Sequence, residues 1–170
     1  DELPPLSDGV ELVELIEGEI MVKGSPSTKH QRLVLAIARM LLDTVPDGHV
    51  FIAPLSVRLD DYNSFQPDVF WVSANNPHCE IREDQVVGAR DLAVEVISPG
   101  SARIDRGIKF EKYQEHGVRE YWLVEPELAF LQVWLLQDGR YTQHGIFAAG
   151  ETFSSATIGK EVPLQNVFPE

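Results

Sequence analysis

The feature that most constrains the fold is an acidic residue inside an apolar run. Glu95 interrupts the segment "LAVEVI" (92–97), where alternate residues of a strand would face opposite sides of a sheet. Burying a charged carboxylate without a partner costs several kcal/mol. Glu95 therefore lies either on the solvated face of an edge strand or in the interior, where it pairs with another group or binds a metal ion.

A second acid occupies a comparable place. Asp68 follows Pro67 at the start of the apolar segment "DVFWV" (68–72), which predicts a short buried strand. Mg²⁺ is typically held by one or two carboxylates together with phosphate oxygens. The two acids together predict a site for Mg²⁺ (or Mn²⁺) better than either acid does alone.

The first half of the sequence predicts strands around one helix. Apolar residues on both sides of Glu17-Gly18 indicate a strand, a turn and a second strand over 11–22. A helix follows from the cap at Ser27 or Thr28 and is stopped by "PDG" (46–48). The segment 73–90 is predicted to be mostly loop, which makes Cys79 a loop thiol.

The second half repeats this alternation. A helix is predicted over 101–117, closed by Gly117, and it is followed by the strand "EYWLVEP" and a hairpin that turns near Asp138-Gly139. This order predicts an α/β fold with a mixed β-sheet flanked by helices. A chain of 170 residues is expected to form one domain, residues 1–170.

Charge and composition limit the expected partners. The net charge is −13, and because DNA binding depends on neutralising phosphates, any DNA partner would need a local basic groove. No apolar run reaches the roughly 18 residues of a membrane span, so no membrane contact is expected. The N-terminus is acidic and contains proline, unlike a secretory signal, and a single cysteine excludes an internal disulfide. We expect a cytoplasmic protein.

Three segments resemble a known family. The sequences "QPDVFWV", "DLAVEVISPGS" and "RIDRGIKFEKYQEHGVREYWLVEP" are similar to the Uma-type restriction endonuclease family, within the PD-(D/E)XK nuclease-like superfamily. The resemblance runs from "ELIEGEI" to "VPLQNVF" and so covers nearly the whole chain. It implies a restriction-endonuclease-like core in which Asp68 and Glu95 share a divalent metal, and Mg²⁺-dependent hydrolysis of phosphodiester bonds in DNA. Many nucleases of this fold act as dimers, so a homodimer is implied as well.

One position departs from the superfamily pattern. The lysine normally found two residues after the second acid is replaced by Ile97, whose backbone carbonyl can still ligate a metal. Members of this family commonly carry a lysine in the following helix, and here that residue is Lys109. On a helical wheel Lys109 lies about 40° from Tyr113 and borders the predicted buried arc. It would orient the attacking water or a phosphate; otherwise it is an ordinary solvated lysine.

Two further residues are weaker candidates. His30 shares the apolar stripe of the first helix, where a core histidine is the commoner outcome, and Glu19 could reach the metal from the first hairpin. Three readings of the function remain open. The chain is an endonuclease, or it is a non-catalytic module that keeps the nuclease fold for assembly or partner binding, which its acidic charge and Ile97 favour. A metal-binding regulatory domain without hydrolysis is a third.

Overall fold

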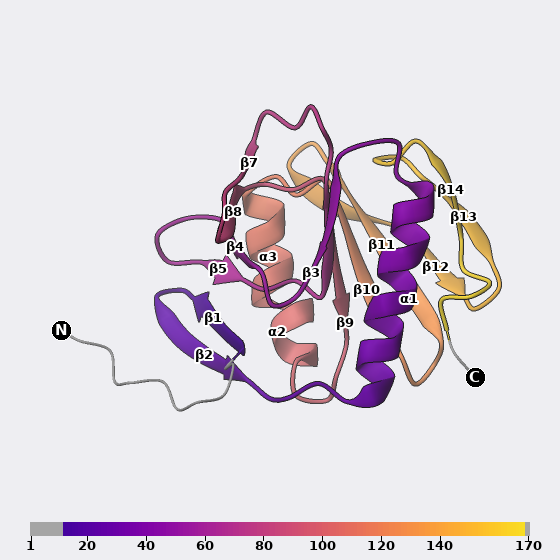
Figure 1. Ribbon diagram of the computed structural model, residues 1–170, viewed down its shortest axis with the longest axis horizontal. Coiled ribbons are helices and arrows are strands. Elements are labelled where there is room, and N and C mark those ends of the chain that lie inside the picture. Colours follow the sequence, from indigo (N-terminus) through magenta and orange to yellow (C-terminus); the bar gives the residue numbers. More distant parts are fainter. Residues whose placement is uncertain (1–11, 169–170) are drawn as a thin grey trace.

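A six-stranded mixed sheet forms the centre of the protein (Figure 1). The computed structural model describes residues 12–168, so Glu11 and the two chain ends of the predicted domain lie outside the described residues. The strand order is β12-β11-β10-β9-β6-β3, and only β9 and β10 are parallel neighbours. The strands are β3 (His49–Ile52), β6 (Val69–Val72), β9 (Leu92–Val96), β10 (Glu120–Glu125), β11 (Phe130–Gln137) and β12 (Arg140–Ala148). The predicted mixed sheet is confirmed.

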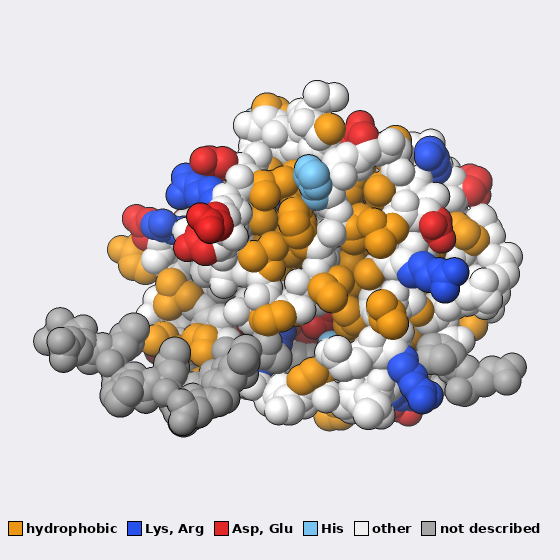
Figure 2. Space-filling view, in the orientation of Figure 1, with side chains coloured by type: hydrophobic (Ala, Val, Ile, Leu, Met, Phe, Trp, Pro, Cys, Tyr) orange, Lys and Arg blue, Asp and Glu red, His pale blue; other side chains and the backbone are white. Residues whose placement is uncertain are grey.

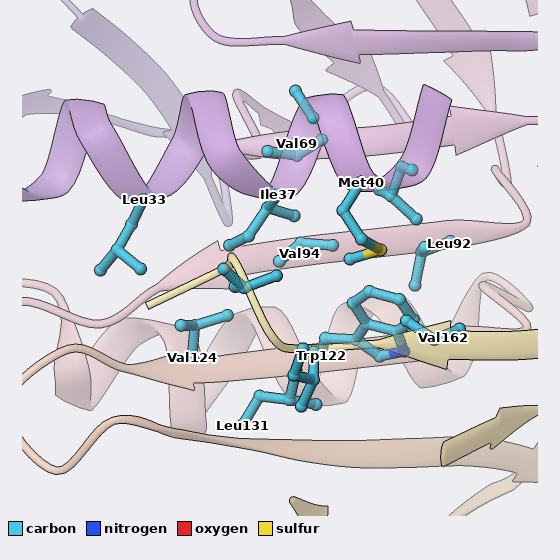
Figure 3. Packing of buried hydrophobic residues seen from close by; sticks show 14 of the residues in the cluster. Leu33, Ile37, Met40, Val69, Leu92, Val94, Trp122, Val124, Leu131 and Val162 are labelled. Carbon is cyan, nitrogen blue, oxygen red and sulfur yellow. The ribbon is translucent and has the colours of Figure 1, made fainter. Parts of the chain in front are cut away.

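Helix α1 (Thr28–Thr44) covers one face of this sheet. Its predicted N-cap is confirmed, because the Ser27 hydroxyl accepts a hydrogen bond from the backbone N–H of His30 at 3.1 Å. Figure 3 shows Leu33, Ile37 and Met40 pointing from α1 toward the sheet. They form one core with strand residues that include Val94, Trp122, Val124 and Leu131.

The opposite face of the sheet is covered by two short helices, α2 (Ala102–Arg106) and α3 (Ile108–Glu115). The predicted single helix over 101–117 is therefore wrong in one respect: the chain breaks at Gly107. A Cβ atom at Gly107 would lie 2.7 Å from the carbonyl oxygen of Arg103, a contact that only glycine avoids. The predicted end of the helix is confirmed, because Gly117 follows α3 with a φ of +83°.

A second six-stranded sheet lies beside the first, in the order β2-β1-β5-β4-β8-β7. Its strands are β1 (Leu12–Ile16), β2 (Glu19–Lys23), β4 (Ser56–Arg58), β5 (Ser64–Phe65), β7 (Cys79–Ile81) and β8 (Gln85–Gly88). The predicted first hairpin is confirmed, with Ile16 opposite Glu19 across the turn.

The prediction that 73–90 is mostly loop holds for most of the segment, but it missed two short strands, β7 and β8. The prediction of a loop thiol is wrong, because Cys79 begins β7. The many charged residues of this segment are exposed at the end of the sheet. Because of these charged residues, the sequence shows no clear strand pattern here. What holds β8 is a parallel pairing with β4 that fully buries Val86, and such a distant pairing leaves little local signal.

The C-terminal strands β13 (Thr152–Ser155) and β14 (Lys160–Pro163) form a separate hairpin. Glu120, fully buried in β10, ties it to the central sheet: its carboxylate accepts from the Ser155 hydroxyl at 2.8 Å and the Thr157 N–H at 3.2 Å. No helix within residues 12–168 is long and apolar enough to cross a membrane.

Candidate active site

The two acids singled out in the sequence lie side by side at the end of the central sheet. β6 and β9 are antiparallel, with Val69 opposite Val94, and the same register continued by one residue sets Asp68 opposite Glu95. Directly opposite residues share a face of the sheet. The backbone N–H of Val96 donates to Asp68 Oδ2 at 2.7 Å. This hydrogen bond fixes the Asp68 carboxylate against β9.

Lys109 enters the same region from α3. Its side chain is fully buried, and the ammonium Nζ lies 3.0 Å from Glu95 Oε1, 2.9 Å from Glu14 Oε1 and 3.3 Å from Asp105 Oδ1. Of these three contacts, only the one with Glu95 is a hydrogen bond, and the buried Oδ1 of Asp105 accepts none. Tyr113, one helical turn after Lys109, donates its hydroxyl to Glu95 Oε1 at 2.9 Å.

The first hairpin closes the cluster from a third side. Glu14, on β1, is 2% exposed and accepts a hydrogen bond from the backbone N–H of Gln66 at 2.8 Å. Lys23, on β2, lies 3.4 Å from Glu14 Oε1 and 3.5 Å from the carbonyl oxygen of Gln66. The Lys23 side chain is 23% exposed, so its ammonium group borders both the cluster and the solvent.

Helix α1 contributes His30 from its first turn. His30 Nε2 lies 3.2 Å from Asp68 Oδ1, and both side chains are largely buried. The hydrogen bond to Asp68 raises the pKa of His30 above its usual value. The pKa of Asp68 is lowered: burial opposes ionisation, but the hydrogen bond and charge of His30, Lys23 and the Val96 N–H outweigh it. Asp68 is thus held ionised beside a readily protonated imidazole.

Glu95 has the opposite electrostatic character. Its burial raises its pKa to about 8, although the nearby Lys109 ammonium works against this shift. The pKa of Lys109 is also raised, because the surrounding carboxylates outweigh the effect of burial. The two pKa values can rise together, because Lys109 is surrounded by three carboxylates, whereas Glu95 shares the single Lys109 ammonium with Glu14 and Asp105.

The donor set of this cluster fits a divalent cation. Four acids, those of Glu14, Asp68, Glu95 and Asp105, face only two ammonium groups and the His30 imidazole. A bound divalent cation would offset the excess negative charge and favour the ionised form of Glu95. Within residues 12–168 no three His, Cys, Asp or Glu side chains are grouped to hold a metal by themselves. Backbone carbonyls, water or substrate phosphates would have to complete the coordination.

The remaining predicted site residues fall in two different places. Ile97 continues β9 beyond Glu95; its N–H donates to Val124 O at 2.9 Å, and its side chain packs in the core near Tyr113. Glu19 is exposed on β2 and lines a separate cavity of about 290 Å³ with residues of α2 and α3. The structure therefore brings Asp68, Glu95, Lys109 and His30 together and leaves Glu19 outside this group.

Sequence reasoning missed Glu14, although the signal was present. In "LVELI" (12–16) a single acid interrupts an apolar strand, the same pattern that marked Glu95. Tyr113, Asp105 and Lys23 carried no comparable signal, because a tyrosine or a charged residue in a helix or hairpin is ordinary. Their place depends on how α2, α3 and the hairpin pack.

Comparison with known proteins identifies the family. The family model of Uma2, described as "Putative restriction endonuclease", matches residues 2–165. The chain belongs to the Uma2 family. An "Uncharacterized protein" of Synechocystis sp. is 29% identical over 116 residues, a match that covers 66% of this chain and 65% of the relative, just under two thirds of the relative's length.

A solved structure agrees with this assignment. The crystal structure of a "putative nuclease belonging to DUF820" from Anabaena variabilis has a TM-score of 0.72 and 18% identity, and the match covers 92% of this chain and 89% of that one. At this identity the similarity shows the fold, which confirms the predicted restriction-endonuclease-like core. The family description names a nuclease activity, and the similar structure supports the fold alone.

Proposed function

We propose that this Uma2 protein is a Mg²⁺-dependent nuclease that hydrolyses phosphodiester bonds of DNA. The observation that carries the proposal is the buried contact between Glu95 and Lys109, 3.0 Å long, beside a second acid, Asp68, on the neighbouring strand. A core has no structural need for three acids around one buried ammonium, with Asp68 as a fourth acid beside them. Such a charge excess is typical of sites that bind a metal ion and a phosphate.

Asp68, Glu95 and the backbone carbonyl of Ile97 are the proposed ligands. When bound, Mg²⁺ (or Mn²⁺) would supply Lewis-acid stabilisation of the phosphoryl oxygens and a water of lowered pKa. The protein prepares the two carboxylates for this role. The Val96 N–H fixes one oxygen of Asp68, and the Tyr113 hydroxyl fixes one oxygen of Glu95.

Lys109 has the third role in the proposal. Its ammonium is held by carboxylates at 2.9 to 3.3 Å, so it is preorganised next to Glu95. Once those carboxylates engage a cation, their hold on the ammonium weakens, and a Lys109 donor becomes available to orient a water or a phosphate oxygen. A fixed positive charge there stabilises the negative charge that develops on phosphorus oxygens.

His30 and Lys23 are proposed to lie on the side of the site from which the substrate would approach. Both are partly exposed, at 18% and 23% for the side chains, whereas Lys109 is not. His30 can carry a proton at the edge of the site because Asp68 raises its pKa. Since the chain has a net charge of −13, these few cations would bind DNA weakly, and the binding would decline with salt.

A non-catalytic module that keeps the nuclease fold is the second candidate. The observation in its favour is that the buried Lys109 ammonium already lies within 3.3 Å of three carboxylates. In such a protein Lys109 would act only to neutralise buried acids, and the fold would serve assembly or partner binding.

A nicking assay on supercoiled plasmid separates the two candidates. The wild-type chain, tested with Mg²⁺ or Mn²⁺ and with EDTA, is compared with Asp68→Asn, Glu95→Gln and the control Glu161→Gln, which changes an exposed carboxylate on β14. The nuclease proposal predicts metal-dependent nicking that falls at least about 100-fold in the first two variants and persists in the control. Lack of nicking across double-stranded and single-stranded substrates with either metal would favour the non-catalytic module.

A further inference from the structure

Strand β3 leaves one side of the central sheet open. It is the last strand of the sheet and pairs with β6. The N–H of Ala53 donates to Asp68 O, whereas Trp71 O, opposite Val50, accepts from Asp91 on the other side. Because backbone groups alternate in direction along an antiparallel ladder, the N–H and C=O groups of Val50 and Ile52 point away from β6. No strand covers them within the residues that the structure describes.

The surface around this open edge is apolar. Ile52 is 47% exposed, and on the neighbouring helix α1 Leu35 and Leu42 are 68% and 64% exposed. Figure 2 shows hydrophobic side chains gathered on both sides of β3, with charged side chains toward the margins of that face. An apolar, open strand edge invites pairing with another chain.

We propose that this face, made of β3 and the exposed leucines of α1, binds a second copy of the same chain. The two β3 strands would pair antiparallel about a two-fold axis at Phe51, and the two central sheets would become continuous. In that register Val50 lies opposite Ile52 of the partner subunit. The outward N–H and C=O groups of both residues then form one reciprocal pair of hydrogen bonds on each side of the axis.

The register is self-complementary, which favours a second copy over another partner. Val50 packs against the α1 side of the sheet, and by alternation Ile52 faces the same side. The pairing therefore sets apolar residues opposite each other there, and it sets Phe51 opposite its own copy on the other side. The same axis brings the two α1 helices alongside each other. Leu35 and Leu42, two turns apart on one stripe of α1, would then meet Leu42 and Leu35 of the partner subunit.

Charge and area agree with this choice. Two chains of net charge −13 repel each other, so they can associate only through a surface without acidic side chains at its centre. Helix α1 is about 25 Å long, and the sheet edge and helix together are about 20 Å deep. Each copy would bury about 500 Å², and the total of about 1,000 Å² is the lower limit of a specific interface. The dimer is therefore expected to be weak and to strengthen with salt, which screens the repulsion.

Sedimentation equilibrium of the full chain tests the proposal between about 1 and about 300 µM. The wild type is expected to pass from monomer to dimer within this range. Ile52→Lys and Leu42→Lys lie on different elements, and each should weaken the dimer at least tenfold, so one remains informative if the other fails to fold. The matched control is Leu128→Lys, since Leu128 is 71% exposed on the turn after β10, and it should leave the dimer unchanged.

Hydrogen exchange adds a readout specific to strand pairing. The amides of Val50 and Ile52 should exchange at least tenfold more slowly at the highest concentration than in dilute protein. A chain that stays monomeric throughout would overturn the proposal, and would mean that the face is bare or belongs to a different protein. So would a dimer that tolerates both lysine variants, or one in which the two amides gain no protection.

Discussion

The ammonium of Lys109 lies 3.0 Å from the carboxylate of Glu95 inside the protein, and the two residues come from α3 and β9 on facing layers. The chain reaches this geometry by breaking at Gly107, between α2 and α3. Two acids from other elements, Glu14 and Asp105, contact the same ammonium. Lys109 therefore joins three segments of the fold and occupies the region where the proposed metal and phosphate would bind.

Replacing Lys109 tests both its structural and its proposed chemical role. Lys109→Met should abolish metal-dependent nicking and also lower the free energy of unfolding by about 3–5 kcal/mol, because it leaves buried carboxylates without their cation. Because of this burial, a variant of unchanged stability is not expected. The measurements are urea unfolding and plasmid nicking.

Divalent ions supply the control for that variant. If the acids of the cluster bind a metal, Mn²⁺ should restore part of the lost stability of Lys109→Met, because the ion replaces the missing positive charge. Equal stabilisation of the wild type and the variant by Mn²⁺ would speak against this explanation.

Glu14 is predicted to act on the site through Lys109. Glu14→Gln removes one of the three carboxylates that hold the ammonium, while its amide oxygen can still accept from Gln66 N–H. Nicking should fall by about tenfold or less, which is a smaller loss than for Glu95→Gln. The affinity for Mn²⁺ should change by less than about threefold. A loss of Mn²⁺ binding as large as in Glu95→Gln would instead make Glu14 a metal ligand.

The raised pKa of Glu95 predicts two effects of pH. Between its unfolded value of 4.5 and about 8 the folded protein binds more protons than the unfolded chain, so the contribution of Glu95 to stability falls as pH rises through this range. Over the same range Mn²⁺ affinity should rise with pH, because the ion binds the ionised carboxylate. Calorimetric titrations at several pH values measure the affinity, and thermal unfolding measures the stability.

Glu95→Gln serves as the comparison in both experiments. Its amide does not titrate, so the stability of this variant should depend less on pH than that of the wild type between 4.5 and about 8. If the two proteins show the same pH dependence of stability, the assignment of this titration to Glu95 is wrong.

Gly48 is predicted to be required for the turn from α1 to β3. It has a φ of +76°, and a Cβ atom there would lie 2.1 Å from Val72 O. Gly139 has a similar φ of +77° but nothing within 4 Å of the same position. Gly139→Ala should cost about 1–2 kcal/mol for the left-handed backbone alone, and Gly48→Ala should cost more. Urea unfolding of the two variants compares them directly, and equal losses would show that the close approach to Val72 does not matter.

The sequence predicted the elements that have strong local patterns. The helix capped by Ser27, the buried strand after Asp68 and the hairpin at Asp138-Gly139 all match the structure. The Gly139 turn is an example of why: two consecutive residues with positive φ need a sequence such as Asp-Gly.

Features set by distant contacts could not be predicted in the same way. Strand β8 is held by its parallel pairing with β4, which no local pattern reveals. The break at Gly107 depends on the backbone approach to Arg103 O. The residues of the site divide in the same way, into those marked by a local pattern and those placed by distant contacts. Glu95 and Glu14 stand out as acids in apolar strands, whereas Tyr113 and Asp105 join the site only through the packing of α2 and α3.

The central claim is that Asp68 and Glu95 together bind a divalent cation. Calorimetric titration of Mn²⁺ into the wild type, Asp68→Asn, Glu95→Gln and the exposed-site control Glu161→Gln tests it most directly. We predict one ion per chain for the wild type and the control, and a loss of affinity of at least about tenfold in each of the two site variants. Unchanged Mn²⁺ binding in both Asp68→Asn and Glu95→Gln would contradict the claim.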